Sequence, residues 1–237
     1  MLNATKMNGF LAHIRQFGRQ YFLYALLAYF SYLMLLITLQ YVPPDLNAAF
    51  LGIKQQEIQH GYYQVAFFAH VYTSVFTLLA GFTQFSERIR KQYAYVHRLL
   101  GKLYIAIVLL FSAPSGLIIG LHANGGLFSQ IAFCLLAVLW FWFTWMAYQK
   151  VRLKNFEAHR RYMWRSYALA LSAITLRLWK WIIVALFEPL PIDAYRTVAW
   201  LGWVGNLLLV EWYLRSRRTT RTILTERTEL TKKAVAK

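Results

Sequence analysis

The sequence predicts an all-α membrane protein with six transmembrane helices, and three observations lead to this fold class. Of the 237 residues, 59% are hydrophobic and only 15% are charged, a balance too apolar for an ordinary soluble domain. Apolar runs of about twenty residues, the length that crosses a hydrocarbon core of about 30 Å, recur along the chain. Lysines and arginines gather in alternate connecting segments, as they do in the cytoplasmic loops of membrane proteins.

Six apolar runs are long enough to be transmembrane helices. The second, third and fifth each place small and hydrogen-bonding residues on one helical face, and in lipid such faces turn toward other helices. We therefore expect a four-helix core made of the second to fifth spans. The chain then divides into a cytoplasmic arm (1–19), a transmembrane domain (20–214) and a basic cytoplasmic tail (215–237). The six runs cover residues 20–42, 62–85, 99–122, 128–148, 164–187 and 195–214.

The 26 lysines and arginines predict the orientation of the chain. Of these, 22 lie in the N-terminal arm, the second and fourth connections with their flanks, and the tail, whereas the opposite face carries only Lys54 and Arg196. Because basic residues of short loops stay on the cytoplasmic side, we expect both termini in the cytoplasm. This topology accounts for the net charge of +17, so no nucleic-acid partner is needed to explain it.

Arg177 is a fixed charge inside the fifth predicted span, in the segment HRRYMWRSYALALSAITLRLW. A charged side chain at that depth is costly unless a partner receives it. Glu211 is the one carboxylate within a predicted span, and it lies near the cytoplasmic end of the sixth, too far from Arg177 to pair with it. We therefore expect an anionic group from outside the chain, such as a carboxylate, a phosphate or a haem propionate.

Depth along the helices brings His70 and Arg177 to a similar level. His70 lies roughly 12 Å below the external end of the second span, and Arg177 lies roughly 15 Å below the external end of the fifth. The two side chains are therefore expected to face one cavity. If the fifth span is one continuous helix, His159 also shares a face with Arg177, because 18 residues make five turns.

Four histidines are candidate haem ligands, since a neutral imidazole nitrogen is a good axial donor to iron. His70 and His122 lie toward the outside, and His97 and His159 lie toward the cytoplasm. Depth argues against some pairings: His97 and His122 are about 37 Å apart along one helix, and His70 and His122 differ by about 12 Å. His97 and His159 are level but interfacial, so helix capping or contact with lipid headgroups is the alternative to a ligand role.

Several motifs together resemble a known family. A histidine in the second span, GFTQF at its exit, HR..G..Y opening the third span and HRRYMWRSYAL leading to Arg177 resemble the bacterial membrane proteins catalogued as domain of unknown function 2306. The resemblance covers about His70 to Arg177, with Tyr162 where a tryptophan is expected. It implies a multi-pass protein of the bacterial cytoplasmic (inner) membrane and no particular reaction. A more distant resemblance to membrane b-type cytochromes implies haem b.

Three functions are compatible with these observations. The first is a small transmembrane redox module that binds haem b, with His70, His97, His122, His159 and Arg177 as cofactor-binding residues and a quinone as a possible partner. The second is a carrier or binding protein whose cavity accepts a small anion or a lipid. The third is a membrane scaffold without a ligand. The lipid bilayer is the one partner common to all three, and the sequence determines neither an enzymatic activity nor an oligomeric state.

Overall fold

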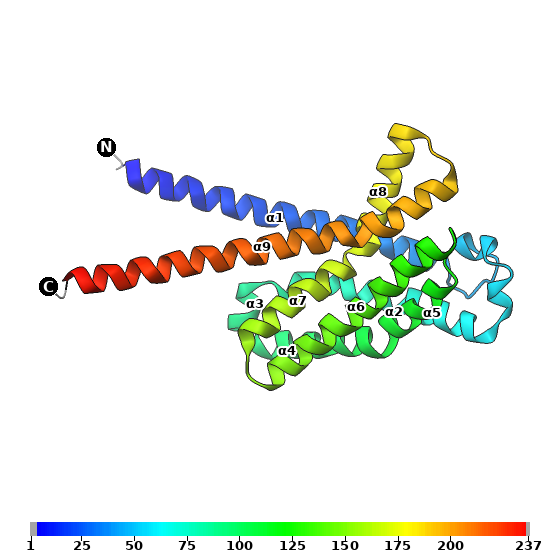
Figure 1. Ribbon diagram of the computed structural model, residues 1–237, viewed down its shortest axis with the longest axis horizontal. Helices are drawn as coiled ribbons and strands as arrows, with labels where there is room; N and C mark the ends of the chain where they lie inside the picture. Colours follow the sequence, from blue (N-terminus) through cyan, green and yellow to red (C-terminus); the bar gives the residue numbers. More distant parts are fainter. Residues whose placement is uncertain (1–3, 236–237) are drawn as a thin grey trace.

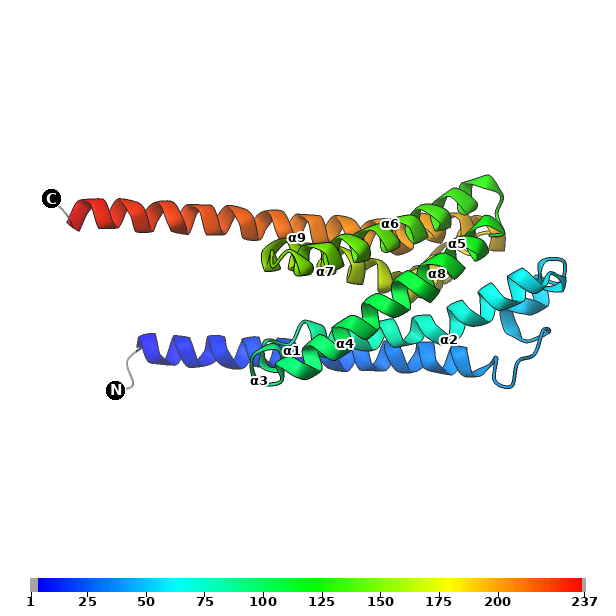
Figure 2. The same cartoon turned by 90° about the horizontal axis from the view of Figure 1, so that it is seen from below.

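The computed structural model describes residues 4–235, and within that range every regular element is a helix (Figure 1). The predicted all-α membrane fold is thereby confirmed. Figure 2 shows α1 and α9 along opposite sides of the bundle, both extending beyond it at the end where the termini lie. The helices are α1 (Ala4–Leu39), α2 (Gly61–Gln84), α3 (Glu87–Gln92), α4 (Ala94–Ile107), α5 (Ala113–Leu121), α6 (Leu127–Arg152), α7 (Phe156–Ala170), α8 (Ser172–Phe187) and α9 (Pro191–Val235).

Each predicted span lies, to within a few residues, inside one helix of the bundle or inside two consecutive ones. Four helices of the described chain are long and apolar enough to cross a membrane, and α7 with α8 makes a fifth if the pair is one broken span. The helix α9 is not among them, so the sixth span stays a prediction. The predicted arm and tail continue α1 and α9 as helix, and the side chains of residues 1–17, 20 and 218–237 lie outside the described part.

The fifth predicted span is broken, which corrects the expectation of one continuous helix. α7 ends at Ala170, α8 begins at Ser172, and the two axes differ by 42°. The break is stabilised from α9, because Asn206 Nδ2 donates to the Ala168 carbonyl at 3.0 Å and to Thr175 Oγ1 at 2.9 Å. These bonds satisfy backbone and side-chain groups that a regular helix would pair internally. The predicted shared face of His159 and Arg177 is therefore wrong.

The third predicted span is interrupted close to Pro114, as the proline suggests. A π-helical turn (Val108–Ser112) separates α4 from α5, and Pro114 lies in the first turn of α5. Proline lacks the backbone N–H that would continue the helical ladder, so regular hydrogen bonding cannot pass through this point. The carbonyl of Ser112, at the end of the π-helical turn, accepts from a side chain of α2, described below.

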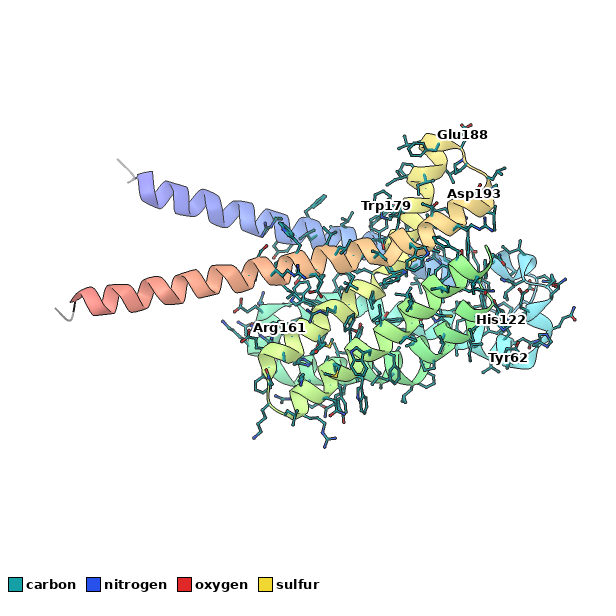
Figure 3. The ribbon with its side chains drawn as sticks, viewed as in Figure 1. Tyr62, His122, Arg161, Trp179, Glu188 and Asp193 are labelled. Atoms are coloured by element: carbon teal, nitrogen blue, oxygen red, sulfur yellow. The ribbon has the colours of Figure 1, made fainter. Side chains whose placement is uncertain are left out.

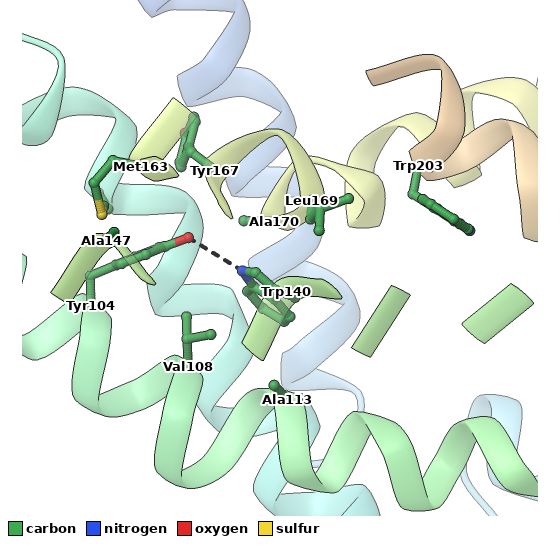
Figure 4. Close-up of a cluster of buried hydrophobic side chains, with 11 residues drawn as sticks. Tyr104, Val108, Ala113, Trp140, Ala147, Met163, Tyr167, Leu169, Ala170 and Trp203 are labelled. Carbon is green, nitrogen blue, oxygen red and sulfur yellow. Dashed lines mark hydrogen bonds between the residues drawn. The ribbon is translucent and has the colours of Figure 1, made fainter. Parts of the chain in front are cut away.

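The core lies in the half of the bundle nearer the termini. Side chains of α2, α4, α6, α7 and α9 pack there, with Tyr104 and Tyr167 at its centre. Figure 4 shows Trp140 of α6 directed at Tyr104 of α4, whose hydroxyl oxygen accepts from the indole N–H at 3.3 Å. We call this half the terminal half. The other half, which carries the loop 43–60 with two short helices, η1 (Ala49–Ile53) and η2 (Glu57–Gln59), is the loop half.

Candidate ligand-binding cavity

A cavity of about 230 Å³ lies in the loop half, between α2, α5, α6 and the broken α7–α8 pair, with the loop 43–60 over one end. Its wall combines apolar side chains with a small number of polar ones, the usual composition of a ligand pocket. The polar groups come from five separate segments of the chain. They are Lys54, Tyr63, His70, Ser74, Thr77, Ser112, His122, Ser172, Arg177 and Tyr195, with Trp140 contributing an indole.

His70 of α2 is held in one tautomer on the cavity wall. Its Nδ1 lies 2.9 Å from the Ser112 carbonyl oxygen, which can only accept, so Nδ1 carries the proton. In the neutral ring Nε2 is then an acceptor, and no hydrogen bond to Nε2 is formed within the described part of the chain. The ring also lies against Gly116, where a Cβ would come within 3.1 Å of His70 Cε1. The π-helical turn and this glycine together position the imidazole.

Arg177 of α8 lines the same cavity and lacks a carboxylate partner among the described side chains, those of residues 18, 19 and 21–217. Its Nη1 donates to the carbonyl of Ala173 on its own helix at 2.7 Å, which uses one of five N–H groups. Glu211, the carboxylate considered from the sequence, is occupied elsewhere: Arg165 Nη2 donates to its Oε2 at 3.0 Å, and Arg165 Nε makes a second contact. The charge of Arg177 is therefore not neutralised by these described side chains.

Two hydroxyl groups on the cavity wall also lack partners. Tyr63 is completely buried (0% exposed), and neither its hydroxyl nor that of Ser74 makes a hydrogen bond within the described chain. Buried hydroxyls without partners are uncommon, because each loses its hydrogen bonds to water on folding. Together with the guanidinium of Arg177, these groups supply several unused donors to one cavity.

The loop closes the end of the cavity away from the core. Lys54 is 2% exposed, and its Nζ donates to Glu57 Oε1 at 2.8 Å and to the carbonyl of His122 at 2.5 Å. The ring of His122 is held by Tyr62, whose hydroxyl lies 3.2 Å from Nε2, at the loop end of the molecule in Figure 3. Partial burial raises the pKa of the Glu57 carboxyl, but the hydrogen bond and charge of Lys54, with a backbone hydrogen bond and the nearby His122, leave the pKa below its ordinary value.

The other two predicted ligands, His97 and His159, do not line this cavity. They lie in the terminal half. His97 precedes Tyr104 by seven residues and His159 precedes Ser166 by seven, and the side-chain oxygens of Tyr104 and Ser166 are hydrogen-bonded at 2.7 Å. Two helical turns from a shared contact place the imidazoles at one level, as the sequence suggested. His159 Nδ1 donates to the Ala147 carbonyl at 2.8 Å, whereas His97 Nδ1 is buried without a partner in the described chain.

Haem does not fit the cavity with two histidine ligands. His70 contacts the Ser112 carbonyl, and His122 follows Ser112 by ten residues, about 15 Å along α5. Two axial ligands must approach one iron from the same level, which this separation prevents. The described residues also contain no cluster of three or more histidine, cysteine, aspartate or glutamate side chains suited to a metal ion. Haem binding by His97 and His159 stays a prediction.

Sequence reasoning missed Lys54 and Tyr63. The sequence places Lys54 in an external connection, and its burial depends on how that loop folds back over α5. The one local signal was the i,i+3 spacing of Lys54 and Glu57, which is compatible with an ion pair. Nothing near Tyr63 distinguishes it from the other aromatic residues at the end of α2.

Comparisons with known proteins agree with the membrane fold. A family model described as "Predicted membrane protein (DUF2306)" matches residues 67–214. The match includes the motifs identified above and extends beyond Arg177 into α9. No curated protein and no solved structure gave a match.

Proposed function

Because the chain belongs to the DUF2306 family of predicted membrane proteins, whose description gives no activity, we propose from the cavity itself that it binds a small anion within the membrane. The anion is a carboxylate or a phosphate group. The protein acts as a carrier or binding protein for the molecule that bears this group.

The observation that carries this proposal is the unpaired guanidinium of Arg177 on the wall of a cavity that also contains unpartnered hydroxyls. An arginine without a counter-charge is strongly unfavourable in a low-dielectric environment. A carboxylate or phosphate accepts two parallel N–H bonds from one guanidinium, so it removes the penalty with favourable geometry. Tyr63 and Ser74 are eleven residues apart on α2, about 16 Å by helical rise, so one of these hydroxyls, and not both, can donate to the same small anion.

The test replaces Arg177 and measures anion binding. We expect Arg177→Leu to lose about 10- to 100-fold in affinity, since a hydrogen bond to a charged group contributes about 1.5–3 kcal/mol, and Arg177→Lys to recover it only partly. Binding is measured as a saturable rise in melting temperature in nanodiscs of zwitterionic lipid, with propionate, inorganic phosphate and decanoate as probes. Lys180→Gln is the matched control, because Lys180 is an exposed cation on the same helix and does not line the cavity.

If Arg177 has only a structural role, the expected effect of Arg177→Leu is the opposite. Leucine would then relieve a buried charge, so the variant would melt at a higher temperature with unchanged response to every probe. That result would overturn the proposed function.

The redox hypothesis keeps one supporting observation, the free Nε2 of His70, which has the tautomer suited to a metal ligand. A visible spectrum of the purified protein before and after dithionite decides it. Near-stoichiometric haem that is lost in His70→Ala, or in His97→Ala, would replace the anion proposal with a redox module.

Both termini are proposed to lie in the bacterial cytoplasm, on the strength of the basic residues in the connections. Exposed positions for cysteine labelling are Ile53 and Glu188 on one face and Lys154 on the other. In a background without Cys134, an impermeant maleimide added to intact cells should label the first two and spare the third. Labelling of position 154 alone would show that the termini lie on the opposite side of the membrane.

A further inference from the structure

The end of the cavity that faces the loop is closed to water. Leu51, Ile58 and Tyr63 are 0%, 3% and 0% exposed, and they form a packed cluster beneath the loop. The buried ion pair of Lys54 and Glu57 lies beside this cluster and ties the loop to the end of α5 through the His122 carbonyl. A hydrated ion entering from this end would have to displace both the cluster and the ion pair.

The side of the cavity formed by α8 is open. Arg177 is exposed on the molecular surface although it also lines the cavity, so its guanidinium connects the two. Figure 1 shows α8 directed away from the rest of the bundle, and Figure 3 shows Trp179 and Glu188 along this projecting helix. The exposed surface of α8 is mostly apolar: Trp179 is 39% exposed and Trp181 is 70% exposed, with Lys180 as an exposed cation between them. In a bilayer such a surface contacts acyl chains, so the opening leads into lipid.

The wall next to the core is apolar. Leu136, Trp140 and Leu169 line the cavity there, and the last two are almost completely buried. The cavity therefore has an unpaired cation beside its lipid-facing opening and a hydrocarbon-lined region extending toward the terminal half. This is the complement of a molecule with one anionic head and one apolar chain.

Building on the proposed function, we infer that the ligand is a lipid-phase amphipath, an aliphatic chain ending in a carboxylate or phosphate, which enters sideways from the bilayer past α8. The head group pairs with Arg177 and accepts from one of the free hydroxyls. The chain lies against Leu136, Trp140 and Leu169. Closure of the loop end, the exposure of Arg177 and the apolar inner wall all follow from this one role.

The experiment compares matched probes in nanodiscs of zwitterionic lipid, using the full chain. The probes are acetate, inorganic phosphate, decanoate, decyl phosphate and the uncharged decanol. We expect decanoate or decyl phosphate, or both, to raise the melting temperature saturably at concentrations where acetate, inorganic phosphate and decanol have no effect. Affinity should rise roughly three- to fourfold per added methylene along the carboxylate series until the apolar region is filled. The two decyl probes identify the preferred head group.

Two variants separate head from chain. Arg177→Gln should lose at least tenfold in affinity for the preferred decyl anion, whereas Lys180→Gln should keep it. Leu136→Trp, which fills the apolar region and leaves the head site intact, should weaken decanoate more than hexanoate. It also keeps the test decisive if Arg177→Gln does not fold.

Three outcomes would overturn the inference. Acetate or inorganic phosphate stabilising as well as the decyl anions would leave the proposed anion site standing and refute its lipid-phase ligand. Equal stabilisation by decanol and decanoate would show that the chain binds without its charge. No response of the wild-type protein to any probe would remove the anion site together with this inference.

Discussion

Buried polar groups in the terminal half of the bundle are mostly paired with one another, whereas those in the loop half face a cavity. In the terminal half, Ser166 Oγ lies 2.7 Å from the Tyr104 hydroxyl and 2.6 Å from Thr144 Oγ1. In the loop half, the hydroxyls of Tyr63 and Ser74 have no partner in the described chain. His97 Nδ1 is an exception in the terminal half, and so are the indole nitrogens of Trp200 and Trp203, which pack in or against the core cluster.

The difference separates polar residues that bond one helix to another from those that are available to a ligand. From the sequence alone, a serine, threonine or tyrosine of one half cannot be distinguished from one of the other half. What distinguishes them is the partner, because a closed network satisfies its own hydrogen bonds and an open one does not. Mutations that are matched in chemistry and differ in location can test this distinction.

The largest contrast is expected from adding one methyl group. At Gly81 a Cβ would come within 1.9 Å of the Tyr167 hydroxyl, so alanine must displace a buried ring and break its hydrogen bond to the Leu78 carbonyl. We expect Gly81→Ala to destabilise the protein by about 2–4 kcal/mol, the sum of overpacking and a lost bond. Thermal or denaturant unfolding in detergent measures this.

Two other glycines are the controls for Gly81. Gly116→Ala should cost less than about 1.5 kcal/mol, because the His70 ring, 3.1 Å from the added Cβ, can move a few tenths of an ångström toward the cavity. Gly205 has nothing within 4 Å, so alanine there should be neutral or stabilise the helix by up to about 1 kcal/mol. Equal destabilisation at Gly81 and Gly116 would mean that the loop half is packed as tightly as the core.

Removing one tyrosine hydroxyl in each half gives the next largest contrast. Tyr104→Phe leaves the Trp140 indole N–H without its acceptor, and we expect a loss of about 1–3 kcal/mol. Tyr63→Phe removes a hydroxyl that has no described partner, so the ligand-free protein should unfold within about 0.5 kcal/mol of the wild type. Denaturation of both variants, without and with decanoate, measures the two effects. If Tyr63→Phe were as damaging as Tyr104→Phe without a ligand, the hydroxyl would have a structural partner.

The fold was more predictable from the sequence than the site. An apolar run of twenty residues is a local property, so the bounds of α2 and α6 agree with the predicted spans. The break at Leu171 depends on Asn206 of another helix, which no local pattern reveals. The similar depth of His70 and Arg177 in the membrane could be calculated from helical rise, and both side chains line one cavity. Their role in binding stays a prediction.

The burial of Lys54 could not be predicted, because it depends on how the loop folds back over α5. The smallest expected effect concerns this residue and is a pH-dependent loosening of the loop. The pKa of Glu57 in the folded protein is below its ordinary value: partial burial raises it, and the hydrogen bond and charge of Lys54, a backbone hydrogen bond and the nearby His122 together lower it by more. A lowered folded-state pKa means that the ion pair contributes fully above the ordinary carboxyl range. The contribution is lost as the pH falls through the lower, folded value. Below that value Lys54 keeps only the carbonyl of His122 as a hydrogen-bond acceptor.

A spin label at the exposed position Ile53, in a background without Cys134, reports this change as side-chain mobility between neutral pH and about pH 3. We expect mobility to stay low through the ordinary titration range of glutamate and to rise only below it, while a label at Leu153, between α6 and α7, stays unchanged. Glu57→Gln should be mobile at every pH, because the amide forms no ion pair with Lys54. A transition of the same midpoint in Glu57→Gln would assign the loosening to another carboxyl, Asp45 being the other acidic residue of the loop. The closed loop end on which the lipid-phase route depends would then be held by packing of Leu51, Ile58 and Tyr63 rather than by charge.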